Sequence, residues 1–266
     1  MKRSKITILL AIVLGMTFHS CLDLEPQDQL GGKNMWTSVN DYKQFANTFY
    51  SWTRDFSSVV YDGTHSDKRS DLITYQSYNE FSRGINSIPS SDANYTDNYK
   101  HIRRTNLLLQ NAEAYAKPED IKQYIGEAYF FRAYSYFDLL QLYGDVIITK
   151  KPLDITDPEM KVKRNDRSEV VDLIIDDLNH AVENLPAFKE LTTEEEGRIS
   201  KEGAQAFLSR VALYEGTWQK SRNGNQNTQR SANLLDIAAK AARTVIDAKY
   251  GYTFRLFGTC LLYTSP

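Results

Sequence analysis

The chain is poor in cysteine: its 266 residues include only Cys21 and Cys260. A disulfide framework is therefore excluded as the source of stability, and no Cys-x-x-Cys pair is present to form a structural zinc or redox site. One disulfide between the two cysteines is one interpretation for an exported protein. Attachment of a lipid to Cys21 is the other, and it explains better why this cysteine directly follows the leader segment described below.

The motifs of common enzyme chemistry are missing as well. The sequence has no HExxH motif, no GxSxG nucleophile turn and no Gly-rich phosphate loop. Its histidines lack metal-ligand spacing, and no carboxylate pair stands out as the acid and base of a glycosidase. We therefore expect a protein that is not an enzyme and that needs no metal or cofactor. An exported hydrolase is the alternative, and no motif supports it.

Positive charge and long apolar runs are also scarce. The net charge of −2 gives no electrostatic case for binding nucleic acid. The apolar run at residues 6–18 is shorter than the roughly 20 residues that span a bilayer. Because it follows Lys2, Arg3 and Lys5, it fits a signal peptide. We predict a lipoprotein signal peptide at 1–20, since residues 18–21 are similar to a bacterial lipobox, then a lipid on Cys21 and a tether at 21–37.

Helical periodicity, in contrast, is abundant after residue 38. Apolar residues recur at intervals of three and four, and capping signals precede several of the runs. The predicted helices cover residues 39–56, 95–116, 119–143, 167–185, 200–216 and 233–246, with a polar loop at 217–232. We therefore predict an all-α fold, a tetratricopeptide-like solenoid of helical hairpins with long irregular loops, although no strict 34-residue repeat is present.

The predicted helix at 119–143 contains the stretch GEAYFFRAYSYFDLLQLYGDV, residues 126–146, which is aromatic on all sides. Three interpretations are membrane insertion, a sugar-binding face and a buried packing helix. Membrane insertion is disfavoured because Glu127, Arg132 and Asp138 interrupt the run. Sugar-binding rings normally occupy one exposed side of a helix. A central packing helix is therefore the preferred interpretation.

This stretch also carries a resemblance. Residues 127–139 and 142–146 are similar to the signature helix of the SusD/RagB family. Further similar segments are residues 21–26, 98–102 with Asn106, 167–170 with Asp177 and Leu178, 197–201, and 238–252. The resemblance covers nearly all of residues 21–257, and we assign 38–257 to the helical N-terminal region of such a protein.

The resemblance implies a function. Proteins of this family are surface lipoproteins of Bacteroidota that bind nutrients, usually glycans. It therefore implies a glycan- or nutrient-binding protein on the outer membrane, held by a lipid anchor and exposed at the cell surface. Its partner would be a TonB-dependent, SusC-like transporter. The alternative is a helical-repeat scaffold lipoprotein of the cell envelope that binds no ligand.

Candidate ligand contacts come from the irregular segment at 57–92, which contributes to the glycan site in SusD-like proteins. Aromatic rings beside carboxylates and amides suit sugars, which stack on rings and hydrogen-bond through their hydroxyls. The candidates are Asp67, Asp71, Tyr75, Tyr78 and Asn79. In the alternative interpretation, Tyr75 and Tyr78 fold back onto the helical stack.

The last nine residues, 258–266, read GTCLLYTSP and match neither a helix cap nor the family. We interpret this atypical tail as truncation with readthrough into a sequencing adapter, which would make Cys260 an artefact. A genuine short C-terminus is the alternative.

Overall fold

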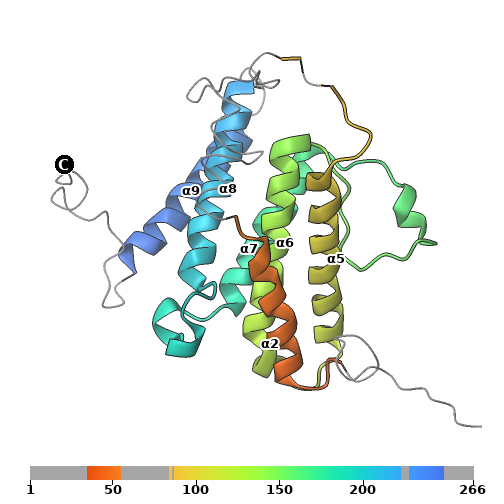
Figure 1. The fold of residues 1–266 in the computed structure, drawn as a ribbon. Coiled ribbons are helices and arrows are strands. Elements are labelled where there is room, and N and C mark those ends of the chain that lie inside the picture. Colours follow the sequence, from red (N-terminus) through yellow and green to blue (C-terminus); the bar gives the residue numbers. More distant parts are fainter. Residues whose placement is uncertain (1–34, 55–83, 86, 223–227, 249–266) are drawn as a thin grey trace, which may run out of the picture. The chain divides into compact units, whose positions relative to one another are not determined.

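The computed structural model describes residues 35–54, 84–85, 87–222 and 228–248. All described helices belong to one compact unit, Trp36–Pro266. Within these residues the secondary structure is helical, and the one β-type pairing is an isolated antiparallel bridge between Val146 and Asn165. The prediction of an all-α fold is confirmed (Figure 1).

The first described helix is α2 (Val39–Asn47), followed by the 3₁₀ helix η1 (Thr48–Trp52). Ser38 and Asp41 form the capping box at its start. The prediction of one continuous helix to residue 56 is wrong at Thr48, where the winding tightens. There the Thr48 hydroxyl donates to the Phe45 carbonyl oxygen at 2.7 Å, and such local side-chain bonds compete with regular helix geometry.

The next two helices form a hairpin. Helix α5 (Ala93–Glu113) is linked through the 3₁₀ helix η3 (Pro118–Ile121) to α6 (Lys122–Tyr143). The Asp92 carboxylate caps α5 by accepting from the Asn94 backbone N–H at 2.9 Å. Gly144 ends α6 as predicted, with a φ of 72° that favours glycine.

The C-terminal half contributes α7 (Arg167–Asn184), α8 (Lys201–Arg222) and α9 (Thr228–Asp247). The short 3₁₀ helix η4 (Pro158–Lys161) precedes α7, and η5 (Phe188–Glu190) and η6 (Thr193–Glu195) lie between α7 and α8. The capping box predicted at Asp166 and Glu169 is present.

The bounds predicted for the polar loop, 217–232, are wrong at both ends, because α8 continues to Arg222 and α9 begins at Thr228, and residues 223–227 lie outside the described residues. The polar side chains that suggested a loop form hydrogen bonds with the helices instead. The Gln219 amide donates to Glu215 within α8 at 2.6 Å, and the Ser231 hydroxyl of α9 donates to the Gly216 carbonyl oxygen of α8 at 2.8 Å. Polarity here reflects contact between helices rather than an irregular backbone.

Each long helix packs against the next one along the chain, from α5 through α6, α7 and α8 to α9, while α2 packs against α5 and α6. This nearest-neighbour stack is the tetratricopeptide-like arrangement that was predicted. Helix α6 lies within it, and the rings of Phe130, Phe131, Tyr136 and Phe137 are buried. The aromatic stretch is therefore a central packing helix, as expected.

The three buried charged residues of α6 are each paired with another element. The Arg132 guanidinium donates two hydrogen bonds to Asp177 of α7, at 2.8 and 2.6 Å. Asp138 accepts from Arg54, which follows η1. Pairing makes burial of such charges tolerable. None of the helices in the described residues is long and apolar enough to span a membrane.

The third charge, Glu127, joins distant parts of the sequence. It accepts two hydrogen bonds from Arg198, at 2.8 and 2.6 Å, while the same guanidinium donates to Asn47 at the end of α2 at 2.5 Å. The neighbouring Ile199 backbone N–H donates to the Tyr50 hydroxyl at 3.0 Å. The segment before α8 therefore holds α2 and η1 against α6.

Candidate ligand-binding site

The residues predicted from the sequence as functional fall outside the described part of the chain. These are the lipidation candidate Cys21 and the ligand contacts Asp67, Asp71, Tyr75, Tyr78 and Asn79. Both their roles and the alternative for Tyr75 and Tyr78 stay predictions. The structure describes the chain before the 57–92 segment up to Arg54, and after the central part of that segment it describes residues 84–85 and everything from residue 87 to the end of α5.

A cavity of about 180 Å³ lies where these two flanking parts meet α6. Trp52 and Arg54 come from η1 and the residues after it, and Tyr134 and Asp138 come from α6. The first turns of α5 supply the rest of the lining: Ala93, Asn94, Asp97, Asn98 and His101. Since positions 94, 97, 98 and 101 are three or four residues apart, α5 presents them on one face. The capped start of α5 thus positions this wall of the cavity.

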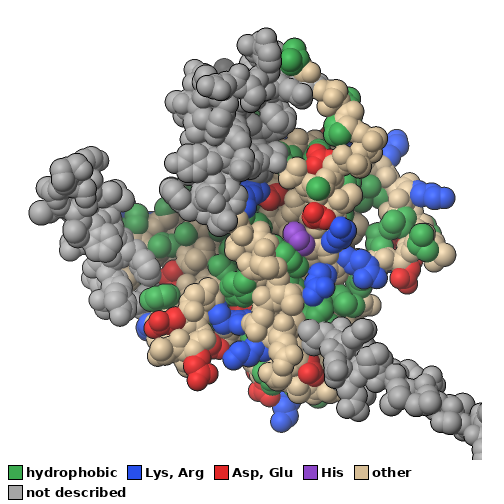
Figure 2. Space-filling model, viewed as in Figure 1, with side chains coloured by type: hydrophobic (Ala, Val, Ile, Leu, Met, Phe, Trp, Pro, Cys, Tyr) green, Lys and Arg blue, Asp and Glu red, His purple; other side chains and the backbone are tan. Residues whose placement is uncertain are grey.

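An aromatic pair forms one side of the cavity. The rings of Trp52 and His101 are stacked, with centroids 4.1 Å apart and planes 14° apart. The pKa of His101 is lowered from 6.5 to about 4, mainly by burial, with Arg104 and Lys100 acting in the same direction and Asp97 opposing the shift. The imidazole is therefore neutral at pH 7. Because the two rings stack face to face, the pair offers a flat, uncharged outer face as a platform. Lys and Arg side chains gather beside a histidine on the face over α5 (Figure 2).

Hydrogen-bonding groups surround this platform. Asn98 is buried and its amide donates to the Asn94 carbonyl oxygen at 2.8 Å. Asp97 is exposed and pairs with Lys100 at 2.8 Å. Burial raises the pKa of the Asp138 carboxyl, and the Arg54 guanidinium opposes that shift. The cavity therefore combines amides, carboxylates and a guanidinium within reach of a stacked aromatic pair.

This combination fits a sugar better than a metal or a reacting substrate. Pyranose C–H faces stack on aromatic rings, and amides and carboxylates are donors and acceptors for hydroxyls. Across the residues that the structure describes, no group of three or more His, Cys, Asp or Glu side chains could hold a metal ion.

Reasoning from the sequence missed these residues. The histidines were considered only as metal ligands, although His101 belongs to the motif at 98–102 that was part of the resemblance. Trp52 follows Phe45 and Phe49 at intervals of four and three, so its spacing indicates a packing residue rather than a ligand contact. The pairing of Trp52 with His101 depends on how α2 packs on α5, which spacing along one helix does not reveal.

The fold and this cavity together define a tetratricopeptide-like helical protein with an aromatic, hydrogen-bonding pocket. A family model described as SusD-like, "Starch-binding associating with outer membrane", matches residues 22–213. Because this match covers more than half of the chain, the chain belongs to the SusD-like family. Proteins of this family associate with the outer membrane.

Individual relatives agree with this assignment. Two SusD-like proteins of Formosa agariphila are each 28% identical to the chain, over 80% and 83% of its length and 42% and 45% of theirs. A solved laminarin-binding SusD-like protein is 28% identical, with a TM-score of 0.53 over 66% of this chain and 36% of that one. A SusD-like protein of Bacteroides fragilis shares the fold, with a TM-score of 0.60 at 23% identity over 85% of this chain and 41% of that one. The chain spans less than half the length of the curated relatives.

Proposed function

We propose that the chain is the helical part of a cell-surface, glycan-binding lipoprotein, and that the Trp52–His101 cavity is one of its sugar subsites. The stacked Trp52–His101 pair is the observation that carries the proposal. Membership of the SusD-like family supports it, as does the laminarin-binding relative. Typical ligand pockets measure about 300–1,000 Å³. A cavity of about 180 Å³ therefore suits a single sugar unit, and the rest of a glycan extends beyond it.

In this proposal the ring C–H face of the sugar stacks on the Trp52–His101 platform. Its hydroxyls hydrogen-bond to Asn94 and Asp97, which are exposed on the same face of α5. A neutral imidazole keeps the platform apolar, since a charged ring would hold water. The predicted contacts at Asp67, Asp71, Tyr75, Tyr78 and Asn79 would extend this site. The protein binds and hands over its ligand without catalysis, metal or cofactor.

The proposed partner is a TonB-dependent, SusC-like outer-membrane transporter that receives the glycan. The SusD-like family assignment supports this pairing. The helical stack offers the extended surface that solenoids use for protein partners. A scaffold that binds the transporter but no glycan is the competing proposal.

Affinity electrophoresis of the 266-residue chain in gels containing laminarin, starch or xyloglucan tests the proposal. We expect at least one polysaccharide to retard the wild type. Trp52→Ala should weaken that binding about tenfold, because it removes the larger ring of the platform. The matched control is Trp218→Ala, which removes a tryptophan of α8 that contacts Tyr214 and Arg167 rather than the cavity.

Three outcomes would contradict the proposal. Equal retardation of wild type, Trp52→Ala and His101→Ala would exclude this cavity as the subsite. Retardation by no polysaccharide, combined with capture of a TonB-dependent transporter, would favour the scaffold. Release of reducing sugar from a polysaccharide would show an enzyme.

A further inference from the structure

Helix α5 also borders a second, larger cavity on another face. This cavity has a volume of about 400 Å³ and lies between α5 and the chain at residues 147–160. From α5 it is lined by Tyr95, Thr96, Tyr99, Lys100 and Arg103. These positions alternate with those that line the Trp52–His101 cavity, so the two cavities share no lining residue.

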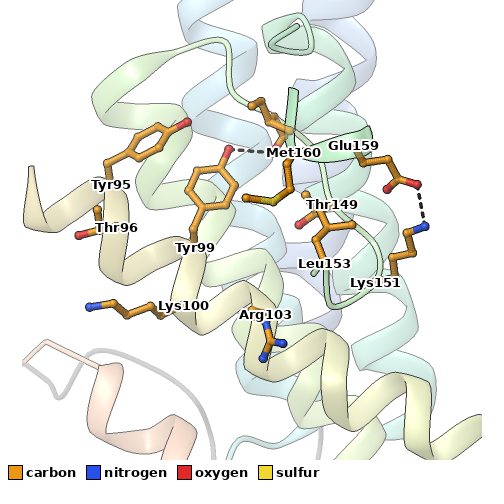
Figure 3. Close-up of a pocket in the computed structure, with 11 residues that line it drawn as sticks. Tyr95, Thr96, Tyr99, Lys100, Arg103, Thr149, Lys151, Leu153, Glu159 and Met160 are labelled. Carbon is orange, nitrogen blue, oxygen red and sulfur yellow. Dashed lines mark hydrogen bonds and ion pairs between the residues drawn. The ribbon is translucent and has the colours of Figure 1, made fainter. Parts of the chain in front are cut away.

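The interior of the second cavity is apolar. The rings of Tyr95 and Tyr99 lie 4.8 Å apart, and Tyr99, Leu153 and Met160 converge on the same space (Figure 3). The Tyr99 hydroxyl donates to the Ile147 carbonyl oxygen at 2.8 Å. That bond fixes the ring and commits its hydroxyl, so the cavity meets the phenol mainly through its apolar face. Walls of this kind suit a hydrocarbon or aromatic group rather than a sugar.

The margin of the cavity is cationic. Lys100, Arg103 and Lys151 line it together with one carboxylate, that of Glu159. Each cation already has an exposed carboxylate partner: Lys100 with Asp97 at 2.8 Å, Arg103 with Asp154 at 4.0 Å, and Lys151 with Glu159 at 2.7 Å. Exposed pairs of this kind contribute little, so an incoming anion can compete for the cations.

We propose that this cavity binds a small carboxylic acid with an aromatic or branched apolar body. The apolar body lies against the Tyr95 and Tyr99 rings and Met160. The carboxylate lies at the margin, where Arg103 offers a forked donor for it. The site is separate from the proposed glycan subsite and does not depend on glycan binding.

A ligand-detected NMR titration of the 266-residue chain tests this with two probes that differ in charge. These are 3-phenylpropanoate and its neutral amide, 3-phenylpropanamide. We expect the acid to bind with a Kd near ~1 mM, as small fragments do at open sites. The amide should bind about fivefold or more weakly, because it lacks the charge-assisted contacts.

Four variants locate the binding. Arg103→Gln should weaken binding of the acid about fivefold and change the affinity for the amide by no more than about twofold. Met160→Ser should weaken both probes, since it removes apolar contact from either one. Glu159→Gln should strengthen binding of the acid about twofold, because it removes the carboxylate that repels the acid from the cavity margin. Lys240→Gln, which removes an exposed cation of α9 paired with Asp236, is the charge-matched control and should change neither probe.

All four substitutions are at exposed positions, and thermal melting by circular dichroism checks that each variant is folded. Equal affinity for acid and amide would overturn the proposal. So would an acid affinity that falls as much in Lys240→Gln as in Arg103→Gln. A neutral disaccharide that displaces the acid, and whose own binding is lost in Met160→Ser, would identify a glycan subsite and overturn it as well.

Discussion

At the scale of single residues, Arg132 illustrates how this helical stack tolerates charge in its core. Arg132 is 5% exposed and Asp177 is 1% exposed. The two side chains share two hydrogen bonds, and Arg132 donates a third to the Asn106 amide oxygen at 2.8 Å. All three residues belong to segments on which the family resemblance was based. These residues of the family motifs therefore have a structural role, because Asp177 and Asn106 supply the hydrogen-bond acceptors that the buried Arg132 guanidinium needs.

Arg132→Met should lower the free energy of unfolding by about 3–5 kcal/mol, because it leaves the Asp177 carboxylate buried and unpaired. Urea denaturation measures the change. The double variant Arg132→Met/Asp177→Leu should recover much of the loss, since it buries no charge at all. Lys240→Met is the exposed control and should cost at most ~1 kcal/mol. If the double variant lost as much free energy of unfolding as the single variant, packing of the Arg132 side chain rather than its charge would account for the loss.

His101 gives a prediction about pH. Burial lowers its pKa from 6.5 to about 4 in the folded chain, so the unfolded chain takes up a proton first as the pH falls. The associated stability is present above pH 6.5 and is lost as the pH falls from about 6.5 towards 4. His101→Gln should therefore show a smaller fall in the free energy of unfolding between pH 7.5 and 5 than the wild type does, measured by urea denaturation. If the free energy of unfolding fell equally in both proteins, the lowered pKa of His101 would be contradicted.

At the scale of elements, close helix contacts depend on two glycines. A Cβ at Gly126 of α6 would lie 2.9 Å from Leu185 Cγ and 3.0 Å from the Leu185 backbone nitrogen. A Cβ at Gly216 of α8 would lie 2.9 Å from Leu235 Cγ. Both glycines let two helices approach more closely than any side chain permits.

Gly126→Ala should lower the free energy of unfolding by about 1–3 kcal/mol, because the Leu185 backbone has to move. That strain outweighs the gain of up to ~1 kcal/mol in helix propensity. Gly203→Ala is the matched control in α8, where the nearest atom, Ser200 Oγ, would be 3.8 Å away. It should raise stability, and chemical denaturation of both variants measures the contrast. A stabilising Gly126→Ala would show that the α6–α7 contact can relax.

Much of this element structure could be predicted from local signals. Ser38, Asp166 and Gly144 mark helix ends through their own hydrogen-bonding and φ preferences, and those ends were placed correctly. The polar residues Gln219 and Ser231 were wrongly assigned to a loop, because in the structure Gln219 hydrogen-bonds within α8 and Ser231 of α9 hydrogen-bonds to α8. The pairs Arg132–Asp177 and Trp52–His101 could not be predicted, since each joins residues whose proximity depends on helix packing. The family resemblance identified several of these residues without revealing their partners.

At the scale of the whole molecule, the proposed anchor determines where the protein works. If Cys21 carries the lipid, Cys21→Ala should abolish acylation and release the protein from the membrane fraction. A single cysteine change is sufficient because the acyl chains supply the membrane affinity. Incorporation of labelled palmitate, compared with the Cys260→Ala control, measures this outcome. Labelled Cys21→Ala protein would contradict the prediction.

The contacts of Arg198 also affect the order in which the chain can fold. Asn47 and Arg198 are separated by 151 positions. At ~5–20 residues per second, residue 198 is synthesised about 8–30 s after residue 47. The contacts of Arg198 with α2 cannot form before then, although α2 can already pack against α5 and α6. Contacts at such sequence separation slow folding relative to a bundle with only local contacts. The attachment of α2 is therefore completed only after residue 198 has been made, later than its packing on α5 and α6 becomes possible.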